Sequence, residues 1–204
     1  MHLPNLLGGT LVKTLTRLTL LSAVSVVFGA PAPALCAPPL SPSGVQVSGP
    51  STAMASSTGS KVPQDQAQAA LDFQNAKRHD VGVPPLQWSA DLAAAAQKWA
   101  DHLAADEHCN LVHTVNDPYG ENLFGGSGAP YTALTASQAW YSEIAKYHYG
   151  VLNGTNWFPT GHYTQMVWRN TTQVGMGQAT CSGGQIVIVA EYNPPGNYLG
   201  QKPY

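Results

Sequence analysis

The hydrophobic period changes near residue 173, and this change constrains the fold more than any other feature. Residues 174–181 (VGMGQATC) and 185–193 (QIVIVAEYN) are β-branched or alternate between apolar and polar positions, as strands do. The SGG segment between them predicts a hairpin connection. Helical patterns precede this hairpin. Helices followed by an antiparallel pair of strands are typical of an α+β domain built in layers.

The first helical pattern covers residues 65–80. Its broad buried face is expected to carry Ala69, Leu71, Phe73 and Ala76. The segment VGVPPLQW (81–88) follows, and its two prolines cannot continue a helix. We therefore expect an extended stretch there.

A second helix is predicted over residues 90–107, because Ser89 is a good N-cap and an apolar face recurs at three- and four-residue steps. Its buried side is expected to carry Leu92, Ala95, Ala96, Trp99 and Leu103. A third helix is predicted over residues 132–149, and a short helical turn is expected after Gly161.

The first 34 residues have the layout of a cleaved secretion signal. Lys13 and Arg17 precede an apolar run at 18–28 that is too short to cross a bilayer, and small residues follow at 30–34. We expect cleavage after Ala34 and therefore a secreted, extracellular protein. A membrane anchor or a misassigned start is the alternative.

The next segment, residues 35–63, is dominated by Pro, Ser, Gly and Ala and has neither a helical nor a strand period. Such a composition predicts a disordered spacer, so the folded domain is expected over residues 64–204. Only 10% of the residues are charged, and the basic ones are scattered. No nucleic-acid-binding surface is therefore expected.

Three cysteines bear on the compartment and on stability. Cys36 lies in the predicted spacer, and the sequence does not indicate its fate. Cys109 and Cys181, 72 positions apart, are candidates for a disulfide in an oxidising compartment. Two buried free thiols are the alternative.

Two histidines and two glutamates are the candidate functional residues. His113 lies in HCNLVHT, Glu121 in YGENLF, Glu143 on the third predicted helix, and His162 in GHYTQ. If a cleft brings them together, they can hold a divalent metal such as zinc or form a proton-sharing network. Taken singly, each histidine is more often a surface or hydrogen-bonded residue, and the chain has neither an HExxH nor a CxxC motif.

Several longer segments occur in one order, namely HCNLVHT, YGENL, Trp140 with Glu143, GHYTQMVWRNT and EYNPPGNYLGQKPY. Together they resemble the CAP superfamily, which comprises cysteine-rich secretory proteins, antigen 5 and pathogenesis-related 1 proteins. The plant pathogenesis-related 1 branch is the best match, over about residues 64–204. The resemblance implies a three-layer α-β-α sandwich with a central antiparallel sheet and a large cleft.

The same resemblance implies roles for particular residues. The four candidates His113, Glu121, Glu143 and His162 match the family's cleft tetrad, in which His113 and His162 would bind Zn²⁺ or another divalent cation. The residues Met166, Val167 and Trp168 match a segment linked to sterol capture. A sterol or another lipid is therefore the implied partner, with membrane contact only through that lipid.

The cysteine pattern of the family is matched in part. The pair Cys109 and Cys181 corresponds to one disulfide of the plant relatives. Thr160, Met176 and Ala190 stand where those relatives carry further cysteines. We therefore expect a single bridge and a less heat-resistant domain.

Three functions follow as hypotheses. The favoured one is a secreted, non-enzymatic binding module with a defence or antimicrobial role. A hydrolase, either metal-assisted or with a serine nucleophile, is an alternative, but Ser142 and Glu143 are helix neighbours that point about 100° apart. No GxSxG motif is present either. The third is a precursor that releases the C-terminal peptide PPGNYLGQKPY, from Pro194, as a signal.

Overall fold

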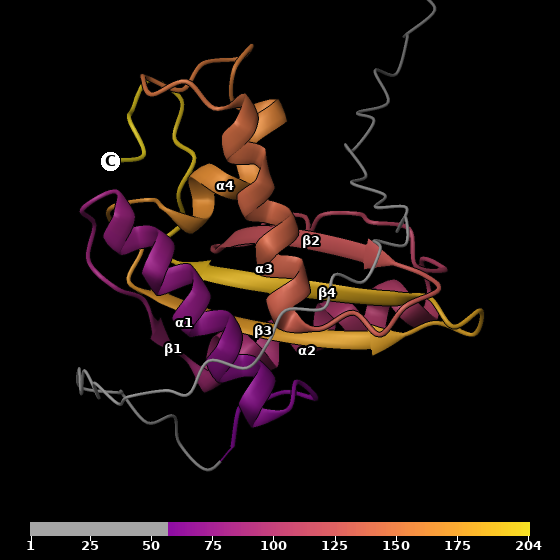
Figure 1. Cartoon of the computed structure of the whole chain (residues 1–204). Helices are drawn as coiled ribbons and strands as arrows, with labels where there is room; N and C mark the ends of the chain where they lie inside the picture. The colour runs from indigo at the N-terminus through magenta and orange to yellow at the C-terminus, as the bar shows by residue number, and fades with distance from the viewer. Residues whose placement is uncertain (1–56) are drawn as a thin grey trace, which may run out of the picture.

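The computed structural model describes residues 57–204 (Figure 1). The predicted secretion signal, most of the predicted spacer and Cys36 lie outside these residues. The elements are α1 (Gln64–Asp80), β1 (Gln87–Trp88), α2 (Ala90–Ala105), β2 (Gly120–Gly126), α3 (Ala133–Tyr141), α4 (Gly161–Met166), β3 (Gln173–Thr180) and β4 (Ile186–Asn193). Two short 3₁₀ helices span Ser142–Lys146 and Phe158–Thr160.

The strands form one sheet in the order β1-β3-β4-β2. The predicted hairpin is β3–β4, with Gln173 opposite Asn193 at one end and Thr180 opposite Ile186 at the other. Strand β2 joins the free side of β4 in antiparallel fashion, and the two-residue β1 joins β3 in parallel. Strand β2 was not predicted, because its sequence GENLFGG contains three glycines, which have low strand propensity.

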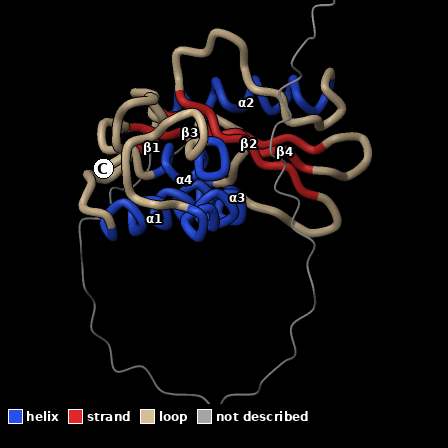
Figure 2. The backbone as a smooth tube through the Cα atoms, turned by 90° about the horizontal axis from the view of Figure 1, so that it is seen from above, coloured by secondary structure: helices blue, strands red, loops and turns tan. Residues whose placement is uncertain are grey.

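Helices cover both faces of the sheet, which gives three layers (Figure 2). Helix α2 packs on one face against Val187 and Val189. Helices α1, α3 and α4 lie over the other face, against Ile188 and Ala190. Because successive side chains of a strand point to opposite faces, β4 supplies both cores. The expected three-layer α-β-α sandwich is confirmed, with a sheet that is antiparallel except at β1.

Glycines in β3 determine how closely α2 approaches the sheet. A Cβ at Gly175 would collide with the backbone of Ala93, and one at Gly177 with the backbone of Gln97. The helix backbone therefore packs directly on these two glycines. Ser89 caps α2 as expected, since its hydroxyl accepts the backbone N–H of Leu92 at 3.3 Å.

The buried face of α1 differs from the expected one. It consists of Ala67, Ala70, Leu71, Gln74 and Arg78, whereas Ala76 is exposed. The periodicity misled the prediction because two polar residues belong to the buried face. Gln74 donates to the Ser137 hydroxyl at 3.0 Å and accepts from the Tyr192 hydroxyl at 3.1 Å.

Arg78 is completely buried and organises the loop that follows α4. Its guanidinium donates to the carbonyl oxygens of Met166 and Trp168, each at 2.9 Å, and of Thr171 at 2.8 Å. A fourth bond reaches the carbonyl of Pro84 at 2.7 Å. The charge is thus surrounded by acceptors, as a buried cation requires.

The third helix is shorter than predicted. It begins after Thr132, which makes a capping box with Thr135, and ends at Tyr141. The chain then tightens into the 3₁₀ helix Ser142–Lys146, so Glu143 does not lie on an α-helix. The Glu143 carboxylate is bound by the first turn of α4, a tertiary contact that the local helical pattern does not record.

The expected disulfide between Cys109 and Cys181 is present. It joins the loop after α2 to the turn between β3 and β4, and the two Cα atoms lie 6.2 Å apart. Packing also extends before the expected domain start near Gln64, because Thr58 and Val62 are buried. Among residues 57–204, no helix is long and apolar enough to cross a bilayer.

Candidate functional site

His162 and Glu143 form the first histidine–glutamate pair. The Nδ1 atom of His162 lies 2.7 Å from Oε1 of Glu143. The other carboxylate oxygen accepts the backbone N–H groups of His162 and Tyr163 at 2.9 and 3.1 Å. These two donors belong to the first turn of α4 and have no partner within the helix. Glu143 therefore caps α4 and fixes the orientation of the His162 ring at the same time.

His113 and Glu121 form the second pair. The Nδ1 atom of His113 lies 2.5 Å from Oε1 of Glu121. Thr114 adds two bonds to this carboxylate, from its backbone N–H at 3.1 Å and from its hydroxyl at 2.8 Å. The Glu121 side chain is 5% exposed and that of His113 is 53% exposed. A buried carboxylate thus anchors a histidine that remains open to solvent.

Both pairs lie beside β2. Asn122, next to Glu121, donates its side-chain amide to the carbonyl oxygen of His162 at 3.1 Å. The indole of Trp140 donates to the Leu123 carbonyl at 3.0 Å and stacks on the His162 ring, with centroids 6.3 Å apart. A cavity beside His162 is also lined by Leu111, two residues before His113. The sheet edge therefore connects residues that are distant in the sequence.

The two pairs share one chemical feature. In each, the glutamate occupies Nδ1 of the imidazole, which leaves Nε2 available to a ligand. Histidines that bind metals usually have this arrangement, because the carboxylate orients the ring and raises its basicity. The donor set therefore fits a divalent metal. That one ion contacts both rings stays a prediction, since no three donor atoms of the tetrad are grouped within 4.8 Å among residues 57–204.

An acidic cluster that was not predicted from the sequence lies next to the second pair. Asp117, Glu121 and Glu191 place carboxylate oxygens within 4.8 Å of one another. Burial, reinforced by the charges of Glu121 and Asp117, raises the pKa of Glu191 well above the usual range for a carboxyl group. The available signal was a single acid directly after the apolar run IVIVA at 186–190.

The residues expected to bind lipid are buried. Met166 and Val167 are 0% exposed and Trp168 is 1% exposed. Their neighbours explain why, since a Cβ at Gly196 would collide with the Trp168 side chain. Lipid binding by these three residues stays a prediction, and it requires the C-terminal segment to move away from Trp168.

Ser142 is not placed as a nucleophile. Its hydroxyl lies 2.6 Å from the Ala139 carbonyl, to which it donates. A nucleophilic serine needs a base within hydrogen-bond reach, and among residues 57–204 the Ser142 hydroxyl is bonded to no histidine and no carboxylate. The neighbouring Glu143 carboxylate is occupied by the first turn of α4.

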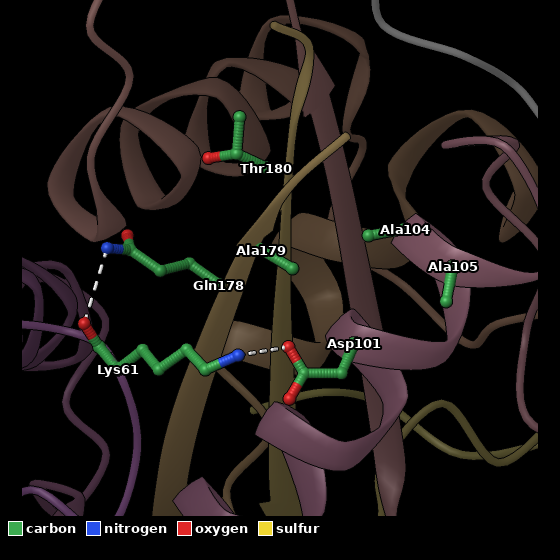
Figure 3. A pocket seen from close by; sticks show the side chains of 7 residues that line it. All are labelled: Lys61, Asp101, Ala104, Ala105, Gln178, Ala179 and Thr180. Atoms are coloured by element: carbon green, nitrogen blue, oxygen red, sulfur yellow. Dashed lines mark hydrogen bonds and ion pairs between the residues drawn. The ribbon is translucent and has the colours of Figure 1, made fainter. Parts of the chain in front are cut away.

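A second hollow lies away from both pairs, between the end of α2 and β3 (Figure 3). Lys61 crosses it and donates to Asp101 at 2.7 Å, and the Gln178 amide donates to the Lys61 carbonyl at 3.4 Å (Figure 3). The side chains lining it include neither a histidine nor a cysteine. The two bonds of Lys61 attach the segment before α1 to α2 and β3, so we assign this hollow a structural role.

Comparisons with known proteins converge on one family. The pattern of the cysteine-rich secretory protein family (CAP) matches residues 71–192. Pathogenesis-related protein 1A of Nicotiana tabacum is 45% identical over 141 residues, which cover 69% of this chain and 82% of that protein. Pathogenesis-related protein 1 of Arabidopsis thaliana is 42% identical over 143 residues, covering 69% and 84%.

Solved structures agree on the fold. The crystal structure of NaASP2 with Zn²⁺ has a TM-score of 0.59 at 24% identity and covers 71% of this chain and 90% of that one. The structure of BmVAL-1 has a TM-score of 0.59 at 23% identity, covering 72% and 84%. At these identities the likeness concerns the arrangement of the helices and strands.

Proposed function

Because this chain belongs to the CAP family, in its pathogenesis-related 1 branch, we propose that it is a secreted, non-enzymatic binding protein that holds a divalent metal between His113 and His162. The observation that carries the proposal is the pairing of each Nδ1 atom with a glutamate. Both imidazoles therefore present Nε2 in a fixed orientation.

Zinc fits these donors best, because it prefers imidazole nitrogen and accepts water or carboxylate to complete four-coordination. When bound, the ion supplies a Lewis-acidic centre for an oxygen atom of a ligand. The chain's own part is to hold the two rings. The Glu143 carboxylate takes part in three hydrogen bonds, and so does that of Glu121. The imidazole rings of His162 and His113 are therefore already oriented before a metal binds.

Calorimetric titration with zinc at neutral pH tests the proposal. We expect one saturable site in the metal-free protein and at least tenfold weaker binding in His162→Ala and in His113→Ala. His79→Ala is the matched control, because His79 is exposed at the end of α1 and should not change binding. Equal zinc affinity in all four proteins would refute the site.

A lipid or sterol is the proposed organic ligand, and exposed aliphatic side chains next to the tetrad residues in the sequence, here called the rim, favour it. Val112 and Val115 flank His113 and are 41% and 80% exposed, and Ile144 next to Glu143 is 37% exposed. Polar imidazoles beside exposed aliphatic side chains suit an amphipathic molecule. The defence role is proposed from the pathogenesis-related relatives.

Sterol titration monitored by tryptophan fluorescence distinguishes the two proposed lipid sites. Val115→Asn should weaken binding several-fold if the ligand lies at the rim and leave it unchanged if it lies under Trp168. Gly183→Ala, which has open space for the added Cβ, is the control for nonspecific effects. The absence of saturable binding by the folded protein would exclude both sites.

The two other hypotheses receive less support. The Ser142 hydroxyl is bonded to a backbone carbonyl, which argues against a serine hydrolase. The peptide that would begin at Pro194 is bound at several points, including Gly196 N–H to Gln165 at 2.9 Å and Arg169 N–H to the Pro203 carbonyl at 2.7 Å. Release of that peptide therefore requires these contacts to break as well as the chain to be cut.

A further inference from the structure

We propose that Asp117, Glu121 and Glu191, here called the acidic cluster, form a second cation site that takes a hard divalent ion such as Ca²⁺ or Mn²⁺. This site goes beyond the proposed function, because it uses carboxylate oxygens in place of imidazole nitrogens and includes Asp117 and Glu191, which are not part of the tetrad. Glu121 is the residue that the two sites share.

The sheet forces two of these carboxylates together. Glu121 of β2 and Glu191 of β4 are directly opposite each other in the antiparallel register. Like charges at such positions destabilise a sheet. Asp117, in the loop before β2, brings a third carboxylate to the same point. The arrangement is unfavourable unless a positive charge or a proton compensates for it.

Glu191 provides an independent indication of a ligand. The residue is 2% exposed, and its Oε2 atom is buried without a hydrogen-bond partner among residues 57–204. A buried polar atom without a partner is costly, and native structures rarely leave one. No lysine or arginine of the described residues forms an ion pair with the acidic cluster. A cation bound at Oε2 would satisfy this oxygen.

The other two carboxylates also retain free oxygen capacity. Asp117 uses Oδ1 to accept the Tyr119 N–H at 3.1 Å, which leaves Oδ2. Glu121 receives His113 and the Thr114 N–H on Oε1 and only the Thr114 hydroxyl on Oε2. Each residue can therefore contribute an oxygen without losing a bond. Ligands that are all oxygen favour calcium, magnesium or manganese over zinc, and water can complete the shell.

The test is calorimetric titration of the metal-free protein with CaCl₂ and, separately, with MnCl₂. We expect one saturable site in the original protein. Glu191→Gln and Asp117→Asn preserve side-chain shape while removing a carboxyl group that can ionise to bind the cation, and each should weaken binding tenfold or more. Asp72→Asn is the matched control, since Asp72 is an exposed carboxylate on α1, on the opposite face of the sheet. It should leave the affinity unchanged.

His162→Ala separates this site from the imidazole site. It should lose zinc binding and keep calcium or manganese binding. Thermal unfolding of each variant verifies that it is folded before titration. If the folded original protein binds neither calcium nor manganese saturably, the proposal is overturned. A proton shared among the three carboxyl groups would then take the place of the cation. Manganese binding that survives Glu191→Gln but disappears in His162→Ala would also overturn it.

Discussion

Single carboxylates perform two tasks at the candidate site. Glu143 orients the His162 ring and also satisfies two N–H groups of the first turn of α4. Glu121 orients His113 and faces Glu191 across the sheet. Each glutamate orients a histidine and also makes contacts that belong to the fold. Its replacement should therefore lower both the stability of the protein and its affinity for the metal.

The first prediction concerns Glu143→Gln. The amide retains the size of the side chain but can replace only part of the charge-assisted bonding to His162 and the α4 N–H groups. We expect a loss of roughly 1–3 kcal/mol in the free energy of unfolding and a 10- to 100-fold loss in zinc affinity. Urea denaturation and calorimetry measure the two effects. Glu107→Gln, at a partly exposed position, should change neither.

The second prediction concerns Arg78→Met. The thioether fills part of the volume but donates no hydrogen bond, so the carbonyl groups of Met166, Trp168 and Thr171 lose their partner. We expect the free energy of unfolding to fall by at least about 3 kcal/mol, as buried acceptors become unsatisfied. Arg169→Met, at an exposed position, is the comparison. Equal denaturation midpoints would contradict this role for Arg78.

At the scale of elements, two loops near the candidate site are attached to segments that are distant in the sequence. The disulfide attaches the loop after α2 to the β3–β4 turn. The C-terminal segment pairs with the loop before α4 through Leu152, which exchanges backbone hydrogen bonds with Gly200 and Gln201. The first connection fixes the chain four residues before His113, and the second fixes the chain ten residues before His162.

The third prediction concerns the disulfide. Its cysteines are 72 residues apart, and the chain-entropy model assigns about 4 kcal/mol to closing a loop of that length. The double variant Cys109→Ser/Cys181→Ser should therefore unfold at a clearly lower urea concentration. Adding a reductant to the original protein should produce the same shift and have no effect on the variant. A variant as stable as the original protein would show that the bridge contributes little.

At the scale of the whole molecule, buried phenols link stability to alkaline pH. Burial, reinforced by Tyr204, raises the pKa of Tyr147 to about 12, and the same causes raise the pKa of Tyr163 above its usual range. Tyrosine side chains of the unfolded chain have a pKa of about 10. Above that pH the folded state keeps protons that the unfolded state loses, so stability falls as pH rises.

The fourth prediction follows from this sign. The stabilisation from Tyr163 is complete below about pH 10 and is lost above it, at roughly 1 kcal/mol per pH unit. The melting temperature should therefore fall between pH 9 and pH 11, and Tyr163→Phe should show a smaller fall. Tyr198→Phe, at a position that is 48% exposed, should follow the original protein. Parallel pH profiles for all three proteins would refute the prediction.

Patterns within one element were sufficient to predict part of this fold. Alternation predicted β3 and β4, and Ser89 with its apolar spacing predicted α2, because these signals depend only on neighbouring residues. Strand β2 was missed because its glycines give it no local preference and pairing with β4 decides its conformation. The face of α1 was misassigned because Gln74 and Arg78 are buried by their distant partners.

The sequence by itself determined the α+β class, the family and which histidines and glutamates are candidates, since these depend on residue type and order. Tertiary structure decided which glutamate pairs with which histidine, that Met166–Trp168 are buried, and that Glu191 meets Glu121. The physical reason is that hydrogen-bond partners and burial depend on strand register and helix packing. These bring together residues far apart in the chain, and no local pattern records that proximity.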